Sequence, residues 1–94
     1  MKFEWNLSKA RANLAKHRVP FELAQRVWDD PLHLVLPDRF EDGEQRWHAI
    51  GIVGPVALLL VVHSYPEEEL ENRVRIIGAR KATRLERNLY EEGA

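Results

Sequence analysis

The spacing of apolar residues predicts two helices in the first third of the chain. The first begins at Ser8, which suits the N-cap position, and extends to about Lys16. The second begins after Pro20, which favours the first turn of a helix, and ends at the sequence Asp29-Asp30-Pro31. Its apolar positions repeat with helical spacing and predict a buried side: Phe21, Ala24, Val27 and Trp28.

The middle of the chain has the alternation and the apolar runs that are typical of β-strands. Four strands are predicted, over residues 32–36, 46–53, 56–63 and 73–80. A polar loop is expected at residues 37–44. The N-terminal sequence Phe3-Glu4-Trp5 fits either a short leading strand or an apolar clip.

A final helix is predicted from its capping residues. Thr83-Arg84-Leu85-Glu86 has the spacing of a capping box, and Gly93 suits the position after the helix end. We expect Leu85 and Leu89 to face inward. The short connections favour an antiparallel arrangement. The sequence thus predicts an α+β fold, one domain over residues 1–94, in which two N-terminal helices and one C-terminal helix cover one face of an antiparallel meander of about four strands.

The composition is that of a small globular protein. The 94 residues are 45% hydrophobic and 31% charged, which excludes an intrinsically disordered chain. The sequence has no cysteine, so disulfide bonds, thiolate catalysis and cysteine-ligated zinc are excluded. There is no apolar signal segment at the N-terminus, and the longest apolar run, residues 56–62, is too short to span a membrane. We therefore predict a soluble, cytoplasmic protein that makes no contact with a membrane.

The formal net charge of -1 conceals a strong segregation of charge along the chain. Residues 1–28 have six basic and two acidic side chains, and residues 73–94 have six basic and three acidic ones. Residues 29–72 have two basic and ten acidic side chains. If the two ends meet in space they form a cationic surface that attracts phosphates. Solvated helix surfaces are the alternative interpretation.

The most informative segment is residues 73–87, where a strand with arginines leads into a capped helix with more of them. Arginine grips phosphate oxygens with two parallel hydrogen bonds, and a helix N-terminus also favours anions. Arg75 and Arg80 have opposite parity, so they share a face only if Gly78 marks a bulge or the strand ends there. A salt-bridged edge strand that neutralises the acidic loop is an equally good interpretation.

The four histidines do not form a metal-binding motif. No two of them have the short helical spacing of a metal-ligand pair, so we predict no metal site and no cofactor. His33 and His48 are expected to have structural or surface roles, and His63, at the end of the central strand, is a weak catalytic candidate.

Taken together, these residues resemble the BrnT-type toxins of bacterial type II toxin–antitoxin systems. The resemblance spans nearly the whole chain, and it depends on the order and spacing of many short pieces: Phe3-Glu4-Trp5-Asn6, Lys9, Asn13, Lys16-His17, Phe21-Glu22, Ala24, Asp30-Pro31, Arg46-Trp47, Ile50-Gly51, His63, Arg75-Ile76-Ile77-Gly78-Ala79-Arg80, Ala82-Thr83, Glu86-Arg87 and Tyr90. Two positions depart from the expected pattern, Gly78, where serine is common, and Asn6, where aspartate is common.

The resemblance implies a ribonuclease toxin with a RelE-like fold. It also implies a cognate ribbon-helix-helix antitoxin of the BrnA type, which neutralises the toxin and represses the operon. Operator DNA would then be contacted only through the antitoxin. A homodimer and an assembly of two toxins with two antitoxins both remain open.

Cleavage of RNA without a metal uses the substrate's 2′-OH as nucleophile, so the protein supplies a base, an acid and positive charge. We assign proton transfer to His17 and charge stabilisation to Arg75 and Arg80. Glu86 is a further catalytic candidate. The residues expected to bind RNA are Lys16, Lys81, Arg84 and Tyr90.

Each of three assignments has a structural alternative. His17 could instead stabilise the C-terminal dipole of its helix, Glu86 could serve only the capping box, and Tyr90 could pack in the core. Two other functions are consistent with the same residues: a non-catalytic interaction module, and a nucleic-acid-binding regulator without hydrolysis. The second is disfavoured because there is neither a helix-turn-helix signature nor an aromatic pair for stacking RNA bases.

Overall fold

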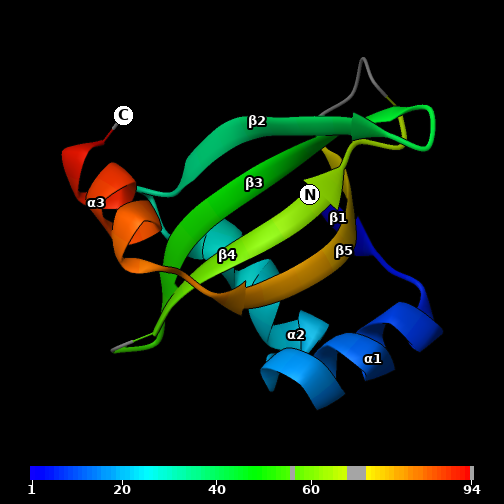
Figure 1. The fold of residues 1–94 in the computed structure, drawn as a ribbon, viewed down its shortest axis with the longest axis horizontal. Helices are drawn as coiled ribbons and strands as arrows, with labels where there is room; N and C mark the ends of the chain where they lie inside the picture. The colour runs from blue at the N-terminus through cyan, green and yellow to red at the C-terminus, as the bar shows by residue number, and fades with distance from the viewer. Residues whose placement is uncertain (56, 68–71, 94) are drawn as a thin grey trace.

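A computed structural model describes residues 1–55, 57–67 and 72–93 and shows a five-stranded sheet flanked by helices (Figure 1). Along the chain the elements are β1 (Lys2–Glu4), α1 (Leu7–His17), α2 (Phe21–Ala24), the 3₁₀ helix η1 (Gln25–Asp29), β2 (Leu34–Glu41), β3 (Glu44–Val53), β4 (Ala57–Ser64), β5 (Arg73–Lys81) and α3 (Arg84–Glu92).

The sheet has the order β1-β5-β4-β3-β2. From β2 to β5 it is the predicted antiparallel meander, so the α+β class is confirmed. The sheet has five strands instead of about four, because the N-terminal segment forms the short leading strand that was one of its two predicted states. β1 pairs with the start of β5 in parallel, with Phe3 opposite Val74. A parallel pair needs a long crossover, which here is most of the chain, and local sequence patterns do not reveal such a pairing.

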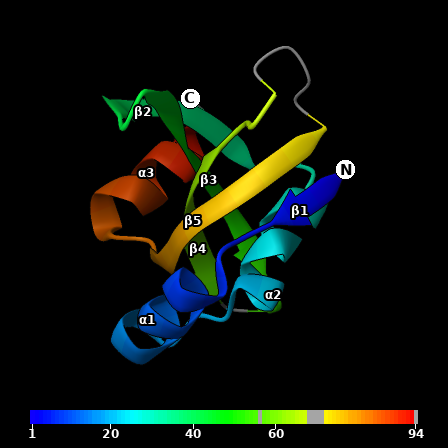
Figure 2. The same cartoon turned by 90° about the vertical axis from the view of Figure 1, so that its right-hand side faces the viewer.

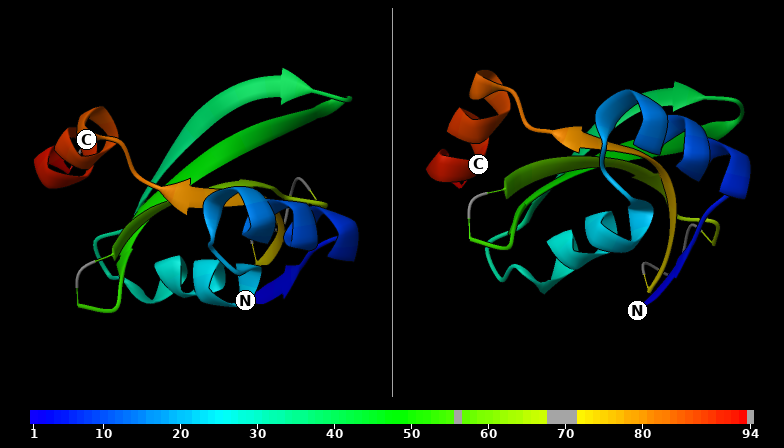
Figure 3. Two further views of the ribbon diagram at one scale, coloured as in Figure 1. Left: turned by 60° about the horizontal axis from the view of Figure 1, so that its bottom comes forward. Right: turned by 90° about the horizontal axis from the view of Figure 1, so that it is seen from below.

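The helices lie on both faces of the sheet, not on one face as predicted. One apolar cluster joins the sheet to α2 and η1 through Phe21, Ala24 and Val27. A second, smaller cluster of Ile50, Leu58 and Leu60 lies on the opposite face, where Tyr90 of α3 packs against it. We call this second face, which faces the viewer in Figure 1, the front face. The view from below shows the sheet between α3 and α2 (Figure 3).

Several predicted boundaries change. Asn6 caps α1 instead of Ser8, because the Asn6 side chain accepts a hydrogen bond from the backbone N–H of Lys9. The second helix begins as predicted after Pro20 but continues as the 3₁₀ helix η1. The predicted strand that starts at residue 56 begins at Ala57 in the structure, and Val56 itself lies outside the described residues.

Two further predictions are wrong, one about a loop and one about a helix side chain. The expected polar loop at 37–44 is mostly strand, because β2 continues through Pro37 to Glu41 as the outermost strand, where proline is tolerated. Leu85 is 72% exposed, because α3 turns Glu86 and Tyr90 toward the sheet instead. The capping box of Thr83 and Glu86 and the C-cap Gly93 are confirmed.

Candidate functional site

A bulge in β5 places Arg75 and Arg80 on the same face of the sheet. Gly78 is opposite Val62, but Ile76 is opposite His63, so Ile77 is an extra residue between them. Ile76 and Ala79 point into the core on the back of the sheet. The two arginines, each next to one of these residues, therefore lie on the front face. From the sequence, Arg75 and Arg80 share a face only if a bulge or a strand end lies between them, and the bulge meets this condition.

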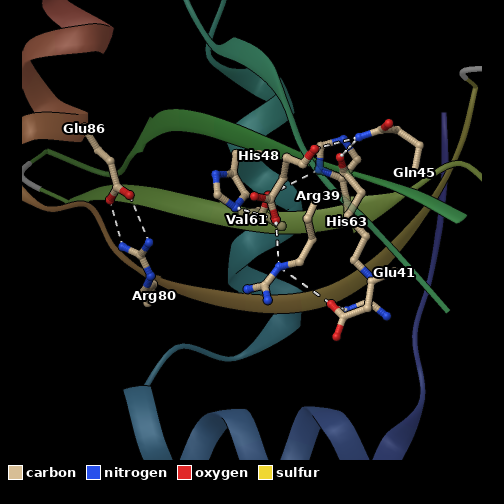
Figure 4. Close-up of polar contacts among 10 residues, drawn as sticks. Arg39, Glu41, Gln45, His48, Val61, His63, Arg80 and Glu86 are labelled. Atoms are coloured by element: carbon tan, nitrogen blue, oxygen red, sulfur yellow. Dashed lines mark hydrogen bonds and ion pairs between the residues drawn. The ribbon is translucent and has the colours of Figure 1, made fainter.

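Arg80 forms a two-pronged ion pair with Glu86 at the start of α3 (Figure 4). Its two terminal nitrogens lie 2.7 and 2.9 Å from the carboxylate oxygens of Glu86. The hydrogen bond from Arg80 lowers the pKa of Glu86 to about 2, against burial, which raises it. The backbone N–H of Thr83 also donates to Glu86. Glu86 therefore serves both the capping box and Arg80, and at neutral pH it is ionised.

Arg75 lies at the other end of the front face and is engaged with different carboxylates. The rise of a strand puts it roughly 13 Å from Arg80 along β5. It donates to Glu4 of β1, and so does Arg73, which also contacts Glu67. These ion pairs, one of them with Glu67, match the charge neutralisation in the alternative interpretation, but β5 is not the edge strand that it assumed, because β1 pairs with it here. Arg75 and Arg80 share a face, but they do not converge on one point.

The C-terminal end of α1 lies beside the C-terminal end of β5 (Figures 2 and 3). The amide of Asn13 fixes this arrangement. It donates to the carbonyl of Ala79 at 2.9 Å and accepts from the N–H of the same residue at 3.0 Å, so it occupies the edge of β5. His17 follows Asn13 by one helical turn on the same side of α1 and so lies near the end of β5.

Exposed basic residues follow one another from the end of α1, past the end of β5, to the first turns of α3. We call this group the basic corner. All of its members are exposed, and within the described part of the chain none of them forms an ion pair: Lys16, Arg18, Lys81, Arg84 and Arg87. The two ends of the chain therefore do meet in space, as the cationic surface required. The predicted RNA-binding residues Lys16, Lys81 and Arg84 all belong to this corner.

Tyr90 is occupied by a structural contact. Its hydroxyl donates to Asp30 at 2.6 Å, and this hydrogen bond, together with burial, raises the pKa of Tyr90 to about 12. Asp30 also accepts hydrogen bonds from the backbone of Leu32 and Ile52. Tyr90 thus fastens α3 to the sheet, which matches the packing alternative for this residue.

Sequence reasoning missed a polar group on β2 and β3, on the side of the front face away from β5. The Nε2 atom of His48 lies 3.2 Å from a carboxylate oxygen of Asp38. Arg39 lies 3.7 Å from Glu41 (Figure 4), and Arg46 contacts the same carboxylate at 3.1 Å. His48 shares the parity of Ile50 on β3, and this was the signal available in the sequence. Asp38 and Arg39 were missed because their segment was expected to be a loop.

The other histidines do not reach this face. His63 is fully buried on the back of the sheet against Trp28 and Tyr65, and burial lowers its pKa to about 4. A hollow of about 650 Å³ lies on the same side, lined by aromatic residues that include Trp47. In the described parts of the chain no three His, Asp or Glu side chains are grouped so that they could hold a metal ion.

The fold and the grouped basic residues define a small α+β protein with a cationic corner at one end of its sheet. Residues 5–86 match the family model for the "Ribonuclease toxin, BrnT, of type II toxin-antitoxin system". The chain therefore belongs to the BrnT family, and the resemblance seen in the sequence is confirmed.

Among solved structures, the ribonuclease toxin BrnT of Brucella abortus matches with a TM-score of 0.69 and 22% sequence identity. The match covers 89% of this chain and 99% of that one, which shows a shared fold. A comparison with curated proteins finds no match. None of the helices in the described residues is long and apolar enough to cross a membrane.

Proposed function

We propose that this toxin cleaves RNA without a metal ion, by attack of the substrate's own 2′-OH. A base removes the proton of the 2′-OH, and the 2′-oxygen forms a bond to phosphorus. The bond from phosphorus to the 5′-oxygen breaks, and an acid protonates that leaving oxygen. The products are a 2′,3′-cyclic phosphate and a free 5′-OH. Membership of the family of ribonuclease toxins is the observation that carries the proposal.

The basic corner supports this function because it collects charges that have no carboxylate partner in the described chain. We propose that Lys16, Lys81 and Arg84 bind phosphates of the RNA on either side of the cleaved bond. Of the two arginines assigned to charge stabilisation, Arg80, held by Glu86, would stabilise the charge that develops on the cleaved phosphate. Arg75, held by Glu4 roughly 13 Å away along β5, would contact a different phosphate of the same RNA. Glu86, ionised at neutral pH, would act on Arg80 as a positioning residue.

Two histidines are available for proton transfer, and they lie on different surfaces. His17, the residue chosen from the sequence, is the last residue of α1, one helical turn after the Asn13 that bonds to β5, and it lies between Lys16 and Arg18 of the basic corner. His48 lies on β3, on the side of the front face next to the edge strand β2, and is oriented by Asp38. Because a histidine that transfers protons typically contributes a factor of about 100 or more, replacing each in turn with alanine identifies which one acts.

The proposed function also includes a cellular role and a partner protein. We propose a cytoplasmic toxin that arrests growth by inhibiting translation, and a ribbon-helix-helix antitoxin that neutralises it and contacts operator DNA. A non-catalytic interaction module is the alternative. It would be favoured if the purified protein left RNA intact and yet bound the product of the neighbouring gene.

Growth arrest on induced expression tests the assignment of residues. Arg80→Ala and His17→Ala should each relieve growth arrest while thermal unfolding shows that the variants are still folded. Arg26→Ala is the matched control, because Arg26 is exposed on η1, away from the basic corner. If both Arg80→Ala and His17→Ala remain fully toxic, the assignment of these two residues is wrong.

A further inference from the structure

A row of three polar residues crosses the front face from β3 to β5. Ser64 on β4 is opposite Arg75 on β5. Trp47 is opposite His63, so the same antiparallel register, continued by one residue, sets Arg46 opposite Ser64. Adjacent strands are about 4.8 Å apart, so donors from these three residues lie within reach of one small ligand.

Two polar atoms in this row are buried and have no hydrogen-bond partner among the described residues. The Oγ of Ser64 and the Nε of Arg46 form no hydrogen bond with any of the residues that the structure describes. Ser64 is only 1% exposed. A buried donor that lacks an acceptor is costly, and it is therefore uncommon in folded proteins. Both atoms are covered in the structure, so an acceptor from outside the chain would reach them only when a covering side chain moves aside.

The rest of each arginine is fixed by carboxylates. The terminal nitrogens of Arg46 contact Glu41 at 3.1 Å and Asp42 at 3.4 Å, which leaves its Nε–H as the free donor. Arg75 is held by Glu4 at 3.2 Å and extends toward Glu44 on β3, so it passes over Ser64. Its contact with Glu44 is long, at 3.9 Å, and is the contact that an incoming anion would most easily replace.

We propose that the row Arg46–Ser64–Arg75 binds one phosphate group of the RNA. This inference rests on the proposed function and adds to the basic corner a second binding site, at the opposite end of the front face. The three groups offer an N–H, an O–H and a guanidinium, all donors toward an oxyanion, and two arginines exclude a metal cation. His48 follows Arg46 by two residues on the same face of β3, so a bound phosphodiester would lie close to an imidazole.

Titration of the whole protein with inorganic phosphate tests this site without requiring cleavage. The side-chain Nε–H signal of Arg46, followed by NMR, should move in a saturable way. Ser64→Ala should weaken phosphate binding about fivefold, as expected for one lost hydrogen bond. Glu44→Gln should strengthen it, because a competing carboxylate becomes neutral. Ser8→Ala, at an exposed serine of α1, is the matched control and should change nothing.

Stability provides a second measurement for the same residue. Because the Ser64 hydroxyl has no partner in the described chain, Ser64→Ala should unfold at the same denaturant concentration as the parent or at a higher one. If Ser64→Ala is less stable than the parent, the hydroxyl has a partner within the chain. If the Arg46 signal does not move when phosphate is added, the row is not an anion site. Either result overturns the inference.

The outcome of RNA cleavage separates this inference from the proposed function. If phosphate binds at Arg46 but the protein leaves RNA intact, the ribonuclease proposal fails and the anion site stands. If RNA is cleaved, Ser64→Ala should raise the KM for RNA about fivefold. If RNA is cleaved but neither the KM nor the Arg46 signal changes, the ribonuclease proposal stands and this phosphate site is wrong.

Discussion

Replacing Glu86 with glutamine should destabilise the protein at neutral pH and have almost no effect near pH 2. Glutamine keeps an acceptor for the capping box but removes the charge that faces Arg80. The pKa of Glu86 falls from 4.5 to about 2 on folding. At about 1.4 kcal/mol for each tenfold change in proton affinity, the ionised form contributes at most about 3 kcal/mol.

Solvent screening reduces this upper limit. The side chains of Arg80 and Glu86 are 33% and 17% exposed, so we expect a loss of about 1–2 kcal/mol. For a chain of this length, that corresponds to a decrease in Tm of roughly 5–15 °C. Because the folded-state pKa is the lower one, the stabilisation is complete above pH 4.5 and disappears as the pH falls toward 2.

The assay is urea unfolding of the parent and of Glu86→Gln at pH 7 and at pH 2. The difference in the free energy of unfolding between the two proteins should be about 1–2 kcal/mol at pH 7 and close to zero at pH 2. Glu91→Gln, at an exposed position of the same helix, should change stability by less than about 0.5 kcal/mol at either pH. An equal loss for Glu86→Gln at both pH values would refute the reasoning.

Three further substitutions test how the site is held in place, each by urea unfolding at pH 7. Asn13→Ala should lower the free energy of unfolding by about 2–4 kcal/mol, because the backbone N–H and C=O of Ala79 both lose the hydrogen bond to Asn13. A decrease below about 0.5 kcal/mol would contradict this. Gly51→Ala should cost about 1–3 kcal/mol, since the new methyl group would lie 2.9 Å from Val27, whereas the control Gly78→Ala meets nothing nearer than 3.7 Å; equal effects would contradict this. Tyr90→Phe should lower the free energy of unfolding by about 1–2 kcal/mol, because the hydrogen bond to Asp30 is lost. This hydrogen bond stabilises the parent fully below pH 10, and the stabilisation disappears as the pH rises toward 12. The substitution should also remove the phenol that titrates near pH 12 by absorbance, and an unchanged titration would contradict the assignment.

The parts of the fold that depend on local signals could be predicted from the sequence. The capping box of Thr83, the C-cap Gly93 and the meander from β2 to β5 follow from residues close together in the chain. The parallel pairing of β1 with β5 joins residues about seventy positions apart, and its only local signal was an apolar tripeptide. The face that α3 covers was not predictable either, because it depends on a hydrogen bond between Tyr90 and Asp30.

The candidate site shows the same division. Its basic residues were visible as a segregation of charge, but their partners were not. Glu4 holds Arg75 from the opposite end of the chain, and Asp38 orients His48 from a strand that looked like a loop. The parity of Arg75 and Arg80 could be stated from the sequence only as a condition, because a bulge depends on pairing with β4.

The ends of the cleaved RNA test the central claim most directly. Purified toxin should be incubated with a short RNA in the presence of EDTA, and the fragments weighed by mass spectrometry. Attack by the 2′-OH should produce fragments with a 2′,3′-cyclic phosphate and a 5′-OH, and no cleavage should occur when the attacking 2′-OH is replaced by hydrogen. RNA that stays intact, or fragments with a 5′-phosphate that form only when a divalent ion is restored, would contradict it.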